Sequence, residues 1–183
     1  MPGAATAMTG LFGKMPRHGD FVRLGLPADF VAPWDDWASR MILHTRSGLA
    51  TEAWDAAWEA APVWRFRLAP AVCGPLLWAG VVAPSEDMVG RRFPLVVAAS
   101  LVDPDPPEEG WFDATEAAVT LARRGELDAE GLLGALPPSP LPLDSDSTFD
   151  GLCLWWRGAR GAIVTSRGLG DSPVFAWATE AAA

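Results

Sequence analysis

VWRFRLAPAVCGPLLWAGVVAPSEDMVGRRFPLVVAASLV, residues 63–102, contains three patterns that are typical of β-strands. Residues 63–68 alternate, with Trp64, Phe66 and Leu68 on one side and Val63, Arg65 and Arg67 on the other. This alternation predicts a strand with one side that is exposed to solvent or faces a partner. Residues 76–82 and 93–102 are continuous apolar runs, which predict central strands covered on both faces.

The residues before this stretch predict two further strands and two helices. We expect strands over 9–15 and 21–24, joined by a turn over 16–20 that contains Pro and Gly. A shorter helix is expected to begin at Thr51 and to end before Pro62.

The longest helix is predicted between these strands and the helix at Thr51. Pro27 is expected to open a helical turn and Pro33 to restart the helix, which Gly48 ends. Asp35 and Asp36 would then lie in the first turn, where the helix dipole favours acidic residues. Helical spacing places one set of residues on a single face: Trp34, Trp37, Met41 and His44.

Two helices are predicted after residue 102. Asp113 and Glu116 form a capping box before a helix over 114–124, and Asp128 caps a second helix that runs to about Leu136.

The C-terminal part is predicted to be mainly loop and strand. Residues 137–147 form a Pro-rich loop, and residues 151–156 and 162–165 form a hairpin. A last short strand is expected over 174–177, followed by a frayed Ala-rich tail.

Interspersed strands and helices predict an α/β fold in which helices cover both faces of one sheet. The hairpins argue against a purely parallel sheet. We therefore expect residues 1–183 to form a single-domain three-layer α/β/α sandwich with a mixed, largely antiparallel central sheet.

Charge and hydropathy exclude several classes of protein. The net charge is −9, and 12 of the 23 acidic residues lie within residues 101–150, so the basic footprint that nucleic acid requires is missing. The apolar runs are shorter than the roughly 18 residues of a membrane-spanning helix. We find no signal peptide at the N-terminus and expect a cytoplasmic protein.

Sequence motifs for catalysis, metals and cofactors fail in detail. Gly13 and Lys14 look like the end of a phosphate-binding loop, but Met8 and Met15 occupy the places of its first Gly and its Ser or Thr. His18 and Asp20 sit too close together in one turn to converge readily on a substrate.

Two further features also have plain structural interpretations. The acidic run at 146–151 begins like a calcium loop, but Arg157 stands where the loop needs Glu. Cys73 and Cys153 are interpreted as two small buried hydrophobes. We predict no catalytic residue, no metal site and no cofactor.

The positive signal is a set of charged and polar residues held between glycines and prolines, in loops of the kind that often carry binding residues. The candidates for partner binding are Lys14, Asp20, Arg65, Ser85, Asp87 and Arg91. Neighbouring residues are expected to build the fold: Gly13, Pro16, Gly19, Phe21, Trp34, Trp64, Gly74, Pro75, Trp78, Gly80, Pro84, Gly90, Phe93 and Pro94.

At these residues the sequence resembles the TagF (ImpM) family of type VI secretion system accessory proteins. The resemblance covers residues 10–99 well and residues 100–183 weakly. Its segments are GKMPRHGDFVRLGLP (13–27), PWDDW (33–37), APVWRF (61–66) and CGPLLWAGVVAPSEDMVGRRFPL (73–95). The resemblance implies a three-layer fold and a non-enzymatic cytoplasmic regulator, a post-translational repressor of type VI secretion that binds a forkhead-associated scaffold protein.

An alternative hypothesis stays open beside this one. Lys14, Asp20, Asp87 and Arg91 could instead form a site for a small molecule or a phosphopeptide, or the site of an enzyme. This alternative requires the four side chains to converge on one pocket with their charges free. The sequence does not indicate the oligomeric state.

Overall fold

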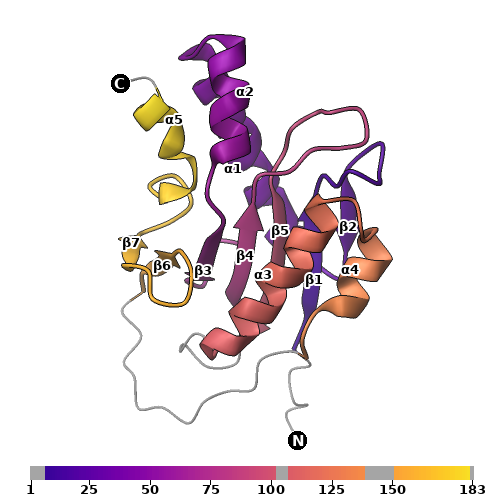
Figure 1. Cartoon of the computed structure of the whole chain (residues 1–183). Helices are drawn as coiled ribbons and strands as arrows, with labels where there is room; N and C mark the ends of the chain where they lie inside the picture. The colour runs from indigo at the N-terminus through magenta and orange to yellow at the C-terminus, as the bar shows by residue number, and fades with distance from the viewer. Residues whose placement is uncertain (1–6, 102–106, 139–150, 182–183) are drawn as a thin grey trace, which may run out of the picture.

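The computed structural model describes residues 7–101, 107–138 and 151–181, which build three layers around one seven-stranded sheet (Figure 1). The strand order is β2-β1-β5-β4-β3-β6-β7, and every pairing between these strands is antiparallel. The strands are β1 (Thr9–Gly13), β2 (Val22–Leu24), β3 (Trp64–Leu68), β4 (Leu77–Ala83), β5 (Leu95–Leu101), β6 (Cys153–Trp156) and β7 (Val164–Ser166).

Helices lie on both faces of the sheet, as the sequence predicted (Figure 1). One face is covered by α1 (Ala28–Ser47), α2 (Thr51–Ala60), the 3-10 helix η1 (Pro173–Phe175) and α5 (Trp177–Ala181). The other face is covered by α3 (Glu109–Arg123) and α4 (Ala129–Ala135). The single-sheet α/β architecture is confirmed. Of the predicted loop at 137–147, residues 139–147 lie outside the described residues.

The two central strands are β4 and β5, as their continuous apolar runs predicted. All residues of both strands are buried except Leu77 and Leu101 at one end. At Gly80 the neighbouring strand approaches so closely that a Cβ would overlap the Val97 carbonyl oxygen, and the Phe66 ring lies over the same position. A glycine is therefore required there by close approach of the backbone.

The expectation that one side of β3 is exposed to solvent is wrong. All five of its residues are buried, including Arg65 and Arg67. Arg67 donates a hydrogen bond to the Leu152 carbonyl oxygen, and α3 lies over Arg65. Alternation with arginine looks like a solvated face, but here acceptors from neighbouring segments satisfy the charged side chains inside the protein.

The tryptophans build the core, as predicted. All ten are buried, and most lie on the side of the sheet that carries α1, α2 and α5. The pairs Trp34–Trp37 and Trp54–Trp58 have ring centroids 5.0 and 5.2 Å apart. Rings at such distances contribute stacking or edge-to-face contacts in addition to apolar burial.

Helix α1 differs from the prediction at its start. Pro33 does not restart the helix but lies inside one continuous element whose first turn contains Asp29, so Asp35 and Asp36 are in its middle. A proline this near the N-terminus removes one intrahelical hydrogen bond, which the aromatic face outweighs. His44 is exposed and is not on that face.

The capping box at Asp113 and Glu116 is also a wrong prediction. Helix α3 begins at Glu109, so both acids lie within the helix and reach across to Arg65. The second cap is confirmed, since the Asp128 carboxylate accepts the Gly131 amide at the start of α4.

The C-terminal strand is a wrong prediction too, and residues 182–183 of the predicted tail lie outside the described residues. Pro173 begins the 3-10 helix, and Trp177 begins α5, which packs against α2. Val174, Phe175 and Trp177 are buried. A short apolar run is too brief for its periodicity to distinguish a strand from a helix. Proline at the first position favours the start of a helix.

Candidate functional site

Two loops at one end of the sheet are joined by a buried ionic cluster. Loop A (residues 14–21) connects β1 to β2, and loop B (residues 84–94) connects β4 to β5. The Asp87 carboxylate of loop B lies 3.1 Å from Lys14 Nζ of loop A and 2.7 Å from Arg91 Nε. The side chain of Asp87 is fully buried, so this carboxylate must be neutralised within the protein.

Backbone hydrogen bonds complete the connection between the loops. Asp87 Oδ1 accepts the amides of Val89 and Arg91 at 3.1 and 2.9 Å, which fixes the turn in loop B. The Met88 amide donates to the His18 carbonyl oxygen at 2.9 Å, and Arg91 donates to the Gly19 carbonyl oxygen. Loops A and B therefore form one unit, although about 70 residues separate them.

The cluster holds Asp87 in its charged form. Burial raises the pKa of the carboxyl, but hydrogen bonds from the Arg91 amide, Lys14, the Val89 amide and the Arg91 guanidinium outweigh that effect. The pKa of Asp87 therefore lies well below its ordinary value. The carboxylate is a structural acceptor at neutral pH and not a proton donor.

The ionic cluster supports three exposed apolar side chains, here called the apolar tip: Phe21, Met88 and Val89. They are 45%, 64% and 69% exposed. The Phe21 ring stacks on Phe12 and meets Phe93 edge-on, while Lys14 Nζ lies 5.0 Å from its centroid. Exposed apolar side chains on a fixed base are typical of a protein-docking surface.

The structure brings together three of the predicted partner-binding residues, Lys14, Asp87 and Arg91, but the first two are buried. Asp20 is exposed in loop A, where its carboxylate accepts the Phe21 amide. Ser85 is buried and lines a separate hollow of about 210 Å³ with Arg92 and Arg123.

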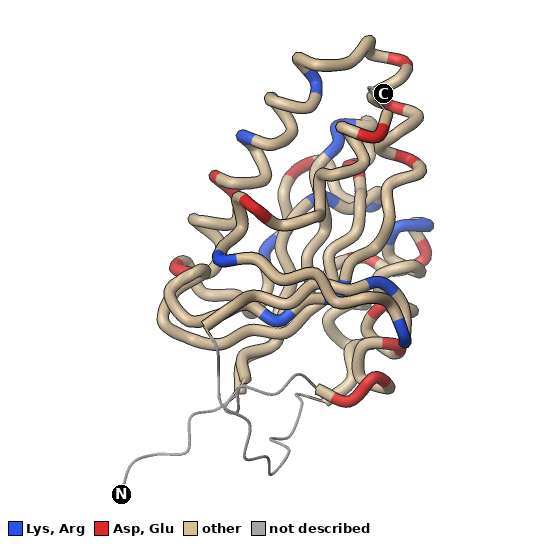
Figure 2. The backbone as a smooth tube through the Cα atoms, turned by 90° about the vertical axis from the view of Figure 1, so that its left-hand side faces the viewer, with Lys and Arg blue, Asp and Glu red and all other residues tan. Residues whose placement is uncertain are grey.

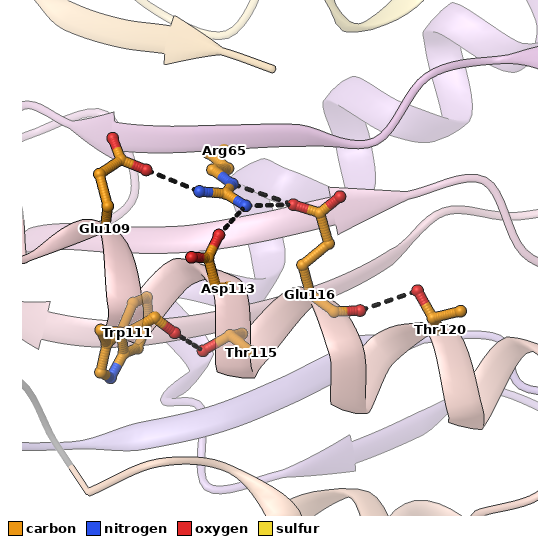
Figure 3. A network of polar contacts seen from close by, with 7 residues as sticks. All are labelled: Arg65, Glu109, Trp111, Asp113, Thr115, Glu116 and Thr120. Atoms are coloured by element: carbon orange, nitrogen blue, oxygen red, sulfur yellow. Dashed lines mark hydrogen bonds and ion pairs between the residues drawn. The ribbon is translucent and has the colours of Figure 1, made fainter. Parts of the chain in front are cut away.

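Arg65 lies away from these loops, between the sheet and α3 (Figure 3). Its guanidinium contacts Glu109 at 2.7 Å, Asp113 at 2.7 Å and Glu116 at 2.8 Å. The three carboxylates are spaced so that they share one face of α3. Burial lowers the pKa of Arg65, but the carboxylates of Asp113 and Glu116 outweigh burial and raise it. The cluster attaches α3 to β3.

Sequence reasoning missed Met88, Val89 and the role of His18. The signal for the first two was present, since Met-Val stands in an otherwise polar loop between Asp87 and Gly90. His18 Nε2 accepts the Ala129 amide at the start of α4, 3.0 Å away. This contact joins residues 111 positions apart and has no sequence signature.

Some of the residues expected to build the fold lie where the structure is crowded, whereas Phe21 is exposed and belongs to the apolar tip. A Cβ on Gly13, whose φ is +134°, would overlap the Pro94 carbonyl oxygen of loop B. Trp34, Trp64, Trp78 and Phe93 are buried. Gly13 therefore allows loops A and B to meet.

The thiols and the acids of the described residues suggest no metal centre. Cys73 and Cys153 are free and buried, and burial raises the pKa of Cys73 to about 12. Within residues 7–101, 107–138 and 151–181, no group of three His, Cys, Asp or Glu side chains could hold a metal ion. In the same residues no helix is long and apolar enough to cross a membrane.

Comparison with known proteins finds both a family and solved structures that are similar to this chain. The family described as "TagF N-terminal domain, Type VI secretion system-associated" matches residues 10–137. The crystal structure of PA0076 from Pseudomonas aeruginosa PAO1 is similar to this chain, with a TM-score of 0.76 and 30% sequence identity over 91% of each chain. None of the curated proteins matches the sequence.

Proposed function

The chain belongs to the TagF N-terminal domain family, which is associated with type VI secretion, and on this basis we propose that it regulates that secretion system. It acts in the cytoplasm as a post-translational repressor, without catalytic activity of its own. It does so by binding a forkhead-associated scaffold protein of the secretion system.

The observation that carries this proposal is the apolar tip on its ion-paired base. Met88 and Val89 project from loop B while Asp87, next to them, is fixed by Lys14 and Arg91. Because the loops are joined before any partner arrives, docking costs little ordering entropy. The apolar tip is therefore the surface we assign to the scaffold protein.

The catalytic or ligand-binding alternative has less support. It requires free side chains that converge on one pocket, whereas Lys14 and Arg91 are both ion-paired with Asp87. The hollow that Ser85 lines also contains Arg92 and Arg123, but Lys14, Asp87 and Arg91 do not line it.

Substitution of the apolar tip tests the proposal. We expect Met88→Ser/Val89→Ser to weaken capture of the purified forkhead-associated scaffold protein by about tenfold or more, since truncation of a central docking residue costs more than ~1 kcal/mol. The change leaves Asp87 and its partners intact, so the fold should persist. The measurement is a titration by calorimetry, with circular dichroism as the check on folding.

Leu43→Ser is the matched control, because Leu43 is 71% exposed on α1. It should bind the scaffold like the wild type. Equal affinity of the tip variant and the wild type would exclude the apolar tip, and failure of the wild type to bind would refute the proposed partner. Lys14→Glu is a poor test, since it would bury a second carboxylate beside Asp87.

A further inference from the structure

The two edges of the sheet differ in how open they are. The sheet ends with β2 on one side and β7 on the other, and no described strand pairs with the outer edge of β7. β7 pairs with β6 from Cys153↔Ser166 to Trp155↔Val164, which leaves its other row of backbone groups available. An unpaired row of amides and carbonyls can accept another strand.

Exposed apolar side chains single out the β7 edge. Ile163 and Val164 are 62% and 40% exposed, and Ala162 and Thr165 are exposed as well. At the β2 edge, by contrast, Val22 is buried and Leu24 is half-buried. An edge strand with exposed aliphatic residues is the one on which strand addition gains apolar burial.

Charge at this edge is opposite to that of the whole protein. Arg160 and Arg167 are exposed on either side of β7, and the one acidic residue from Arg157 to Asp171 is Asp171 itself, whose carboxylate accepts the Arg167 amide, although the net charge is −9. Figure 2 faces the side of the molecule on which β7 lies in Figure 1 and shows basic positions toward both ends of the nearest strand. An acidic segment would complement this edge.

The same charges disfavour a second copy of this chain. In a two-fold antiparallel pairing centred between Ile163 and Val164, Arg160 of one copy would lie opposite Arg167 of the other. Like charges directly opposite one another destabilise a strand pair. The charges therefore disfavour this register of a second copy, and the measurement of oligomeric state below tests the others.

We propose that β7 accepts an extended acidic segment of a protein partner, which adds to the sheet as an eighth strand. Its backbone pairs with the outer row of β7, its apolar residues lie against Val164 on one face of the sheet, and its carboxylates lie on the other face toward Arg167 and the turn that contains Arg160. This interface is separate from the apolar tip, because loop A leads into β2 at the opposite edge of the sheet.

The probe for this proposal is a capped peptide, Glu-Val-Glu-Val-Glu-Val-Glu, and its comparator replaces every Glu with Lys. We expect the full chain to bind the Glu peptide about tenfold more tightly than the Lys peptide, since opposite charges across a strand pair stabilise it and like charges destabilise it. Fluorescence anisotropy measures the affinities. Hydrogen–deuterium exchange should slow at the amides of residues 163–166 when the Glu peptide binds.

Charge reversal makes the test reciprocal. Arg160→Glu/Arg167→Glu should prefer the Lys peptide, while Leu43→Lys, a substitution at an exposed site on α1, should keep the wild-type preference. An unchanged preference in the double variant, or binding without protection of residues 163–166, would overturn the proposal. Sedimentation should find the chain monomeric, and a dimer that Ile163→Lys dissociates would overturn it in favour of a second copy.

Discussion

Asp87 shows how one buried carboxylate can organise two distant loops. It accepts hydrogen bonds from two amides of its own loop, from Lys14 and from Arg91, so its charge is fully used inside the protein. The surface that remains for a partner is the apolar pair that follows it in sequence. The charged side chains at this end of the molecule therefore position the proposed binding surface, and the apolar side chains form it.

This arrangement predicts an acid-sensitive contribution to stability. Because the pKa of Asp87 is lowered on folding, its carboxylate stabilises the protein above about pH 4, the ordinary range of an aspartate, and this stabilisation is lost as the pH falls toward the folded pKa. Asp87→Asn should be less stable than the wild type at pH 7, and its unfolding free energy should fall less between pH 7 and pH 3.

Urea denaturation at a series of pH values measures the difference. Asp20→Asn is the control, since it changes an exposed carboxylate of loop A and should keep the wild-type profile. Parallel profiles for Asp87→Asn and the wild type would contradict this role of the cluster.

At the residue scale the sequence selected the residues of the cluster but did not predict that they pair with one another. Lys14, Asp87 and Arg91 were selected because they stand among glycines and prolines, and the structure does bring them together. Spacing along the chain could not reveal that they satisfy one another, because pairing across two loops is fixed only by the fold. The exposed pair Met88 and Val89 was overlooked although its place in the sequence, between Asp87 and Gly90, could have indicated it.

Among the elements, the strands were more predictable than the helix boundaries. The apolar runs of β4 and β5 have one interpretation, whereas the acids of α3 fit either a cap or a helix face. Arg65 decides between them, since it lies opposite Asp113 and Glu116 in the folded protein. Such a tertiary contact overrides a local capping signal.

The attachment of α3 through Arg65 is testable. We expect Arg65→Met to lower the unfolding free energy by about 1–2 kcal/mol. This is below the 3–5 kcal/mol that follows from stranding a fully buried partner, because the three carboxylates are partly exposed and can rehydrate. Arg65→Lys should recover part of the loss, since an ammonium cannot contact all three at once.

Denaturation in urea provides both values, and Arg40→Met, which breaks an exposed pair with Asp36 on α1, serves as the control with little expected change. Equal stability of Arg65→Met and the wild type would show that apolar burial alone attaches α3.

The whole molecule has two cores that share one sheet. Phe66, Val82 and Val96 face the aromatic layer of α1, α2 and α5, whereas Val81, Val97 and Ala79 face α3 and α4. The layers could be predicted because successive residues of the central strands, which face opposite sides of the sheet, are all apolar. The C-terminal helix α5 could not be predicted from the sequence, because its packing on α2 is what distinguishes it from a strand.

A shared sheet predicts that the two cores unfold together. Tryptophan fluorescence reports mainly on the layer of α1, α2 and α5, and far-ultraviolet circular dichroism reports on all helices. The two signals should give coincident urea transitions, as for a two-state domain. Separate midpoints would show that α3 and α4 unfold independently and that the chain is not one cooperative unit.

Cys73 and Cys153 give this cooperativity a chemical readout. Both thiols are buried on the tryptophan side of the sheet, and the raised pKa of Cys73 keeps it from ionising at neutral pH. Since the thiolate is the reactive species, alkylating reagents can reach these sulfurs only when the protein opens. The rate at which these two native thiols are alkylated therefore measures how often the core becomes exposed, without any engineered label.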